Sequence, residues 1–546
     1  MMEDLYNFWY DNKNLWFGAS SEDDNKLSEY FGKLFDKGVD IEKMLESRKE
    51  AVGTIILYDQ ISRHIMRTSA ELTLFGEPID KLNFGKKTSD LSIEYAEKVY
   101  SYYRHAFFAD EYVFVMLPLR HSYDFNKIKF VMMETWDKIE CEREVIEIEK
   151  YKKFLKATYE RTIKQSNDIQ AIQFYPKEEE QEEGVLDFKE IHERYSDILD
   201  KFECKDVLDK IECKEIKKDL INKFKENLVG TQKTSFIMSI SGGVDSMVCS
   251  YILKQLNIPF VCVHINYNNR KECVKEEDFV VEWCRLLNID LYLRKIDEIN
   301  RPQCMKYNLR DVYERYTRDV RYGTYVKVNK ENCNVILGHN QDDCFENILT
   351  NISQKSKYEN LNGMDTSSSL KFMDTSINFI RPMLDISKKQ IYDFANALNI
   401  PYLWDSTPKW SQRGKIRDIV RPTLEKWNSE MVSGLFEISK IMKESLEMTN
   451  LLVDSWLSKM TDNKIVCIEN ELPLQKIFWN IFFQKLDIRI SNSSLDNLIK
   501  FIERYKTKKI SIDVNAYINY EINKFCQLKL MKIADNKVLI CINQKK

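Results

Sequence analysis

The stretch that decides the fold reads Phe236-Ile237-Met238-Ser239-Ile240-Ser241-Gly242-Gly243-Val244-Asp245-Ser246. Residues 236–240 are mostly apolar, which is typical of a buried β-strand, and residues 245–256 have the pattern of a helix. The two adjacent glycines between them allow a tight turn and a close approach of the backbone to an anion. Because the N–H groups at the start of the helix face that position, residues 241–246 predict a phosphate-binding loop.

The polar side chains of this loop extend the prediction. Ser241 and Ser246 carry hydroxyl groups that can donate to phosphate oxygens. The carboxylate of Asp245 would repel phosphate, so it suggests a bound Mg²⁺ ion. The loop is not a Walker loop, because it has no Gly-Lys-Ser/Thr. It resembles the PP-loop of the N-type ATP pyrophosphatases, which bind ATP and release pyrophosphate while they adenylate a substrate.

Short apolar runs alternate with helical stretches around this loop. The expected strands are 236–240, 259–264, 289–293 and 334–337, and the expected helices are 245–256, 274–287 and 311–328. Repeated strand–helix–strand order predicts a parallel sheet covered by helices.

The chain of 546 residues is long enough for about three or four domains. We expect a multidomain protein with an all-α N-terminal part, a central Rossmann-like α/β part and a small C-terminal α+β part. The predicted boundaries are a helical domain at 1–175, an acidic linker with helices at 176–232, a PP-loop domain at 233–430 and a C-terminal domain at 431–546.

Charge is distributed unevenly along the chain. The net charge of −4 combines −12 over residues 1–232 with +8 over residues 233–546. This asymmetry indicates either a polyanionic partner for the second half or simple drift in surface composition. None of the 13 cysteines forms a Cys-x-x-Cys pair, and no apolar run is long enough to span a membrane, so we expect a reduced, cytoplasmic protein without a membrane partner.

Four further segments resemble motifs of the tRNA(Ile)-lysidine synthetases, in the same order. His264 and Arg270 fit the turn after the second strand, although Tyr267 and Asn268 depart from it. Glu314, Arg318, Arg321 and Tyr322 match a four-residue pattern without a gap, and their spacing places them on one face of a helix. Arg381-Pro382 opens the third segment, and Arg413 to Arg417 lies in the fourth, where Gly414 departs from the pattern.

The segment Gly338-His339-Asn340-Gln341-Asp342-Asp343-Cys344-Phe345-Glu346-Asn347 also resembles this family, with Asn347 in place of a threonine. Its three carboxylates concentrate negative charge at a helix start, where they could bind Mg²⁺ or an ammonium group. Asp342 alone could instead be a simple helix cap. The helices 472–486 and 491–501 and the strands 510–514, 526–531 and 537–542 resemble a C-terminal domain of the same synthetases.

The resemblance implies a two-step reaction that uses ATP and Mg²⁺. The wobble cytidine of a tRNA(Ile) with a CAU anticodon is adenylated, and L-lysine then displaces AMP. The implied catalytic residues are Asp245, Asp342, Asp343, Glu346 and Arg318, with Asp245 and Asp342 as Mg²⁺ ligands. The implied ATP-binding residues are Ser241, Gly242, Gly243, Val244, Asp245, Ser246 and His264, and the implied tRNA-binding residues are Arg321, Arg381, Lys409, Arg413, Lys415, Arg417 and Arg421.

The N-terminal region carries a different resemblance. Phe8-Trp9, Trp16-Phe17-Gly18, the stretch 59–64 and the stretch 117–122 resemble a bacterial family of unknown function built from tetratricopeptide-like helices. Asp59, Arg63, His64 and His121 would then either line a pocket or form a buried polar network between helices. A protein partner for this region is a third interpretation.

Two alternatives to a lysidine-forming ligase stay open at this stage. One is another PP-loop adenylating enzyme, such as a tRNA 2-thiolase, although the missing Cys-x-x-Cys pairs count against it. The other is a non-catalytic RNA-binding or scaffold protein that has kept the fold.

Overall fold

The computed structural model divides the chain into two compact units. The first comprises Met1–Asn340 and Asp365–Asp405, and the second comprises Gln341–Met364 and Ser406–Lys546. The structure describes residues 1–16, 20–68, 73–74, 77–78, 80–165, 171–178, 188–200, 210–228, 235–331, 333–354, 363–404, 411–510, 513, 517–523, 526–534 and 536–544. Over these residues, no helix is both long enough and apolar enough to cross a membrane.

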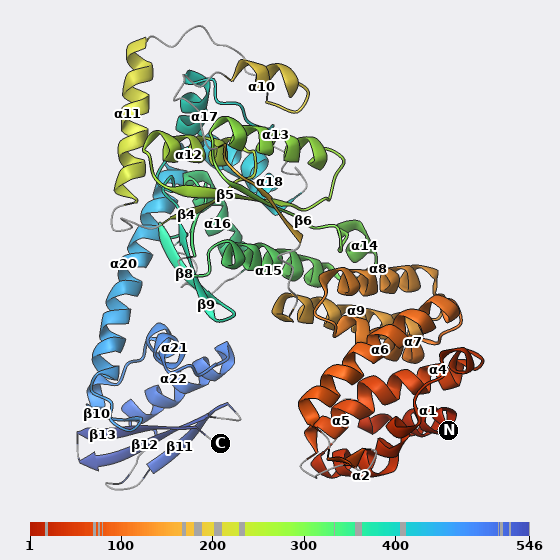
Figure 1. Cartoon of the computed structure of the whole chain (residues 1–546). Helices are drawn as coiled ribbons and strands as arrows, with labels where there is room; N and C mark the ends of the chain where they lie inside the picture. The colour runs from red at the N-terminus through yellow and green to blue at the C-terminus, as the bar shows by residue number, and fades with distance from the viewer. Residues whose placement is uncertain are drawn as a thin grey trace. The chain divides into compact units, whose positions relative to one another are not determined.

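The first unit begins with a layer of helices (Figure 1). Its elements are α1 (Met2–Asp11), η1 (Lys13–Leu15), α2 (Ser21–Phe31), η2 (Gly32–Lys37), α3 (Ile41–Leu45), α4 (Arg48–Ile55), the π-helical η3 (Ile56–Ile61), α5 (Ser62–Arg67), the short strands β1 (Thr73–Leu74) and β2 (Glu77–Pro78), α6 (Lys81–Tyr103), α7 (Ala109–Arg120), α8 (Phe125–Cys141) and α9 (Val145–Gln165). Side-chain oxygens of Ser20, Asp80 and Asp124 cap α2, α6 and α8, which fixes where these helices begin.

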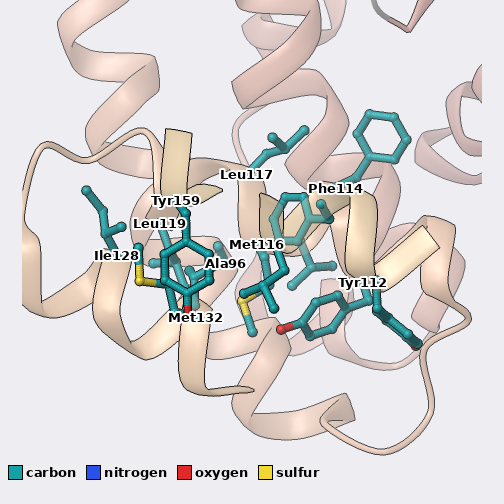
Figure 2. Packing of buried hydrophobic residues seen from close by; sticks show 14 of the residues in the cluster. Ala96, Tyr112, Phe114, Met116, Leu117, Leu119, Ile128, Met132 and Tyr159 are labelled. Atoms are coloured by element: carbon teal, nitrogen blue, oxygen red, sulfur yellow. The ribbon is translucent and has the colours of Figure 1, made fainter. Parts of the chain in front are cut away.

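Helix α7 lies in the middle of this layer. Tyr112, Phe114, Met116 and Leu119 are each at most 1 % exposed, because α7 is covered by neighbouring helices on all sides. Figure 2 shows their side chains among Ala96 and other apolar residues of the same cluster. The expected all-α N-terminal part is therefore confirmed.

A seven-stranded sheet follows in the same unit, in the order β3-β6-β5-β4-β7-β9-β8. The strands are β3 (Ile172–Tyr175), β4 (Phe236–Ser239), β5 (Phe260–Asn266), β6 (Leu291–Lys295), β7 (Asn334–Ile336), β8 (Ser367–Phe372) and β9 (Thr375–Ile380). β6, β5, β4, β7 and β9 pair in parallel, and the edge strands β3 and β8 are antiparallel. The predicted parallel sheet is confirmed, whereas β3, β8 and β9 are additions to it.

Helices cover both faces of this sheet. They are α10 (Lys189–Arg194), α11 (Lys210–Glu226), α12 (Val244–Gln255), α13 (Cys273–Leu286), α14 (Arg301–Lys306), α15 (Arg310–Val328) and α17 (Lys388–Ala397). Successive residues of a strand point to opposite faces, so Met238 packs in the cluster of α12 and α13, and Ile237 in the cluster that includes α15. The strand order reverses at β4, which is the place where α/β sheets bind ligands.

The helical layer and the sheet share one apolar cluster. The hydroxyl group of Tyr159 on α9 donates to the carbonyl oxygen of Glu298 at 2.7 Å, and Glu160 pairs with Arg315 at 3.0 Å. The chain after α9 then enters the sheet as β3, a strand that falls inside the region expected to be helical. The four-part division at residues 175, 232 and 430 stays a prediction.

The second unit contains helices and a separate four-stranded antiparallel sheet in the order β10-β13-β12-β11. Its elements are α16 (Gln341–Ser353), α18 (Gln412–Lys415), the π-helical η6 (Ile416–Val420), α19 (Arg421–Trp427), α20 (Met431–Leu457), β10 (Lys464–Ile468), η7 (Glu469–Glu471), α21 (Lys476–Lys485), α22 (Asn492–Lys506), β11 (Tyr517–Asn523), β12 (Cys526–Ala534) and β13 (Lys537–Gln544). The expected α+β architecture is confirmed. Most of the strand expected at 510–514 lies outside the described residues.

Candidate active site

The loop between β4 and α12 is held by its own two serines. The backbone N–H of Ser241 donates to Oγ of Ser246 at 3.1 Å, and the N–H of Gly243 donates to Oγ of Ser241 at 3.4 Å. The hydroxyl of Ser246 donates in turn to the carbonyl oxygen of Gly243 at 2.9 Å. The loop is thus pre-organised at the start of α12, where the helix dipole favours an anion.

Two glycines let other segments approach this loop closely. Gly242 has φ +83°, and a Cβ atom there would lie 2.4 Å from Cδ1 of Leu403, whose N–H donates to the Gly242 carbonyl at 2.9 Å. A Cβ on Gly338, just after β7, would lie 3.1 Å from the backbone nitrogen of Ser246. Gly242 therefore needs glycine both for steric reasons and for its backbone conformation, whereas a side chain at Gly338 would require the adjacent backbone to shift by a few tenths of an ångström.

Asp245 is the centre of a small polar cluster beside the loop. Its Oδ1 accepts a hydrogen bond from Nδ2 of Asn340 at 2.9 Å, and its Oδ2 pairs with Nζ of Lys388 at 2.6 Å. The side chains of Asp245 and Lys388 are 23 % and 24 % exposed, so the cluster is open to solvent. Lys388 is the first residue of α17, after the cap formed by Ser387.

A family model for the PP-loop domain matches residues 214–426. Residues 214–426 form a PP-loop domain. The matched range includes the loop predicted from the sequence to bind phosphate, and its strand, turn and helix have the expected order.

Curated relatives match the part of the chain that contains the PP-loop domain. A tRNA(Ile)-lysidine synthase of Francisella philomiragia is 26 % identical over 298 residues, which are 54 % of this chain and 71 % of that protein. One from Malacoplasma penetrans is 22 % identical over 302 residues, 54 % of this chain and 98 % of that protein. Among solved structures, the U34-tRNA thiolase NcsA of Methanococcus maripaludis is 17 % identical with a TM-score of 0.35, and the match covers 42 % of this chain and 80 % of that one.

The N-terminal part matches a second family model. It is described as a bacterial protein of unknown function, DUF924, and it covers residues 5–203. The resemblance inferred from the residues around 59–64 and 117–122 is confirmed. The helical layer and the PP-loop domain therefore come from two families joined in one chain.

His264 lies at the end of the PP-loop domain's second parallel strand, and it is buried. Its Nδ1 donates to the carbonyl oxygen of Ile240 at 2.9 Å, one residue before the loop begins. Burial lowers the pKa of His264, so the ring is neutral and links β5 to the end of β4. Its position supports a role in holding the loop. Arg270, in the turn that follows, pairs with both oxygens of Glu276 at 2.7 and 2.8 Å.

The four motif residues of α15 do not share one environment. Glu314 is exposed and pairs with Arg310 at 2.7 Å, and Arg318 is exposed beside Asp319 at 3.7 Å. Arg321 is half-buried, and its guanidinium lies 5.4 Å from the ring centre of Tyr322. The helix face expected for these residues is therefore exposed to solvent at Glu314, whereas at Tyr322 it packs against Phe379.

Arg381, predicted to bind tRNA, is engaged within the PP-loop domain. Its guanidinium donates to the carbonyl oxygen of Asp365 at 2.9 Å, to Oγ of Ser368 at 3.0 Å and to Nδ1 of His339 at 3.2 Å. Burial lowers its pKa. These contacts tie β8 and β9 to the segment that leads into Asn340.

In the second unit, the three predicted catalytic carboxylates meet three of the predicted tRNA-binding arginines. Glu346 is 3 % exposed and accepts from Arg413 at 2.6 Å and from Arg417 at 2.9 Å. Arg413 also pairs with Asp343, and Arg421 pairs with Asp342. The carboxylates lie on α16, and the arginines lie on α18, η6 and α19.

Two other predicted residues of this segment have different positions. Lys415 is exposed on α18. Lys409 lies outside the described residues, as do the neighbouring Asp405, Ser406, Thr407 and Trp410.

Sequence reasoning did not identify Lys388 and Asn340 as site residues. Asn340 lies in the acidic segment 338–347, and Lys388 opens α17. A lysine at the first turn of a helix is unusual, because its charge opposes the helix dipole, and this was the available signal.

Proposed function

We propose that the chain is an ATP-dependent ligase that joins L-lysine to the wobble cytidine of a tRNA(Ile) with a CAU anticodon. The observation that carries the proposal is the cluster of Asp245, Lys388 and Asn340 beside a pre-organised PP-loop. The matched relatives that bear the name tRNA(Ile)-lysidine synthase support the choice of substrate.

The first step of the proposed reaction transfers AMP to the base. The C2 oxygen of cytidine forms a bond to the α-phosphorus of ATP, and the bond from that phosphorus to the departing pyrophosphate breaks. The first turn of α12, with its helix dipole, is suited to hold the pyrophosphate oxygens. The ammonium of Lys388, at the same edge of the sheet, supplies positive charge where negative charge accumulates.

The residues of the first unit are compatible with Mg²⁺. Asp245 lies beside the loop and its side chain is 23 % exposed, so an ion that arrives with the nucleotide can reach its carboxylate. One carboxylate is sufficient for Mg²⁺ when nucleotide phosphates provide further ligands. The ion would neutralise phosphate charge. Among the described residues, no group of three His, Cys, Asp or Glu side chains forms a complete metal site.

The second step replaces AMP by lysine. The ε-amine of lysine forms a bond to C2, the bond between C2 and the AMP oxygen breaks, and the amine loses a proton. A carboxylate such as Asp342 or Glu346 is suited to orient the ammonium and accept the proton. In the structure these carboxylates hold arginines.

Arginine and lysine would therefore compete for the same carboxylates. RNA phosphates attract guanidinium groups through bidentate hydrogen bonds. If tRNA draws Arg417 and Arg421 onto its phosphates, Glu346 and Asp342 become available to the lysine ammonium. This order would prevent lysine from binding productively before tRNA does.

The proposal is tested by incubating the protein with ATP, labelled lysine and tRNA carrying a CAU anticodon. We expect lysine in the tRNA at the wobble cytidine, and its loss in the Asp245→Ala variant. Asp385→Ala is the matched control, because Asp385 is exposed in the same unit. ATP–pyrophosphate exchange without lysine in tRNA would point to another adenylating activity, and an absence of nucleotide binding would point to a scaffold.

A further inference from the structure

The two N-terminal motifs, residues 59–64 and 117–122, lie around one cavity of about 420 Å³. This volume is within the range of about 300–1,000 Å³ that is typical of small-molecule sites. The cavity belongs to the helical layer, and α2, η3, α5, α7 and α9 contribute to its wall together with residues after α1. Helix α7 is fixed by the apolar packing in Figure 2, in which Leu117 is one of the residues that also border the cavity.

Four arginines line this cavity: Arg63, Arg67, Arg120 and Arg161. Two carboxylates oppose them. Asp59 is 2 % exposed and accepts from Arg63 at 2.9 Å, and Asp24 accepts from Arg67 at 3.1 Å. The cavity therefore has an excess of two positive charges before its histidines are considered.

The histidines do not change this balance at neutral pH. Arg63 donates to Nδ1 of His121 at 2.8 Å, so that nitrogen is unprotonated. Burial, together with the charges of Arg63 and Arg120, lowers the pKa of His121 to about 4. Burial also lowers the pKa of His64, which hydrogen-bonds to Asp24 at 2.6 Å.

Of the four arginines that line the cavity, Arg63 and Arg67 pair with carboxylates, whereas Arg120 and Arg161 have no carboxylate within ion-pair distance among the described residues. Arg120 is 3.5 Å from Nε2 of His121 and 5.0 Å from the ring centre of Phe154. The Nε atoms of both arginines are buried and lack a hydrogen-bond acceptor within the described part of the chain. Burial and the charge of Arg161 lower the pKa of Arg120 to about 10. Two guanidinium groups that repel each other inside a cavity are stabilised when an anion binds between them.

One wall of the cavity is apolar. Leu15, Leu117 and the ring of Trp16 lie there, and Nε1 of Trp16 donates to the carbonyl oxygen of Trp9 at 2.8 Å, which holds the ring in place. We propose that this cavity binds a small molecule with a doubly charged phosphoryl group, whose oxygens bind to Arg120 and Arg161 and whose planar, apolar part lies against Trp16.

This site is independent of the PP-loop. All the residues that line it belong to the helical layer, within the part matched by the family of unknown function. The expected ligand of this cavity is a phosphate monoester of modest size.

The test uses the full chain and two probes, inorganic phosphate and phenyl phosphate, at constant ionic strength adjusted with chloride. Isothermal titration should detect binding of both. Arg120→Gln and Arg161→Gln should each weaken it by about tenfold or more, because each removes charged hydrogen bonds. Without ligand, both variants should melt at the wild-type temperature or above, since they relieve repulsion. Arg161→Lys, which keeps the charge, should retain part of the binding.

Three controls localise the signal. Arg285→Gln removes an exposed arginine that pairs with Glu282, and Ser246→Ala alters the PP-loop; neither should change binding at the helical site. Phenyl phosphate should bind about threefold to tenfold more tightly than phosphate, and Trp16→Leu should remove that difference. Binding that persists in both arginine variants, or is lost in Ser246→Ala, would overturn the proposal, as would a clear loss of stability in both ligand-free arginine variants.

Discussion

Replacing Lys388 by methionine separates catalysis from stability at the candidate active site. Lys388 and Asp245 lie 2.6 Å apart, but both are about a quarter exposed, so water and salt screen the pair. At this separation the Coulomb energy at an effective dielectric constant near 20 is about 6 kcal/mol, and desolvation and side-chain ordering offset most of it. We therefore expect the free energy of unfolding to fall by no more than about 1 kcal/mol.

The effect on activity should be much larger. An ammonium at the start of α17 acts on phosphate charge that develops during AMP transfer, and removing such a group typically lowers kcat by about 10²- to 10³-fold. The matched control is Lys389→Met, which removes the same charge from the next, exposed position of the same helix. AMP release in the presence of tRNA and lysine measures the activity, and urea denaturation measures the stability.

Two outcomes would refute this reasoning. If Lys388→Met keeps activity within threefold of the Lys389→Met control, the ammonium does not act on the phosphate. If Lys388→Met unfolds the chain while Lys389→Met does not, the pair with Asp245 is structural, and its charge is not held ready for a ligand.

Three further predictions concern glycine, glutamate and histidine positions. Gly242→Ala should destabilise the chain by about 3 kcal/mol and abolish ATP binding, because a Cβ meets Leu403 at 2.4 Å and φ is +83°; Gly434→Ala, with open space around its Cβ, should be neutral or stabilising in the same thermal denaturation. Glu346→Gln should cost about 2 kcal/mol in urea denaturation, since two arginines lose a buried carboxylate; the exposed Glu425→Gln should cost under about 1 kcal/mol. The pKa of His121 is lowered to about 4 in the folded chain, so the unfolded chain binds more protons below pH 6.5. Stability should therefore fall by up to about 3 kcal/mol as the pH drops from 6.5 to 4, and His121→Gln should flatten that part of the profile; an equally steep profile in the variant would contradict the assignment.

The central strand, loop and first helix could be predicted from the sequence because their signals are local. Residues 236–246 contain an apolar run, two glycines and a helix start, and these specify a strand, a turn and a helix without help from distant residues. β8 could not be predicted in this way, because it begins with Ser367, Ser368 and Ser369 and is almost entirely exposed. It exists as a strand because β9 provides antiparallel hydrogen bonds.

β3 could not be predicted from the sequence for a related reason. Its four residues follow a long helix, and only pairing with β6, more than a hundred positions later, makes them a strand. Propensity alone does not report a strand that depends on tertiary pairing.

The residues of the candidate site show the same difference between local signals and signals that depend on tertiary structure. Asp245 is visible in the sequence, because an acid in a phosphate loop contradicts the chemistry of the loop unless a cation is present. Lys388 is 143 positions away from Asp245, and its role depends on the sheet that brings α12 and α17 together. The sequence shows that Asp342, Asp343 and Glu346 form an acidic cluster. It does not show that these carboxylates pair with arginines from a segment about 70 residues later.

These ion pairs also change what the charge asymmetry means. The +8 of residues 233–546 suggests a surface ready for a polyanion, and residues 409–421 hold five of the basic side chains. Arg413, Arg417 and Arg421 are paired with carboxylates of α16, so their charge is partly neutralised within the unit. A polyanion must therefore displace these carboxylates to gain the full electrostatic attraction, which lowers non-specific affinity. Under the proposed function, the same exchange would release the acidic groups when RNA binds, so the availability of these carboxylates would depend on the partner rather than on net charge.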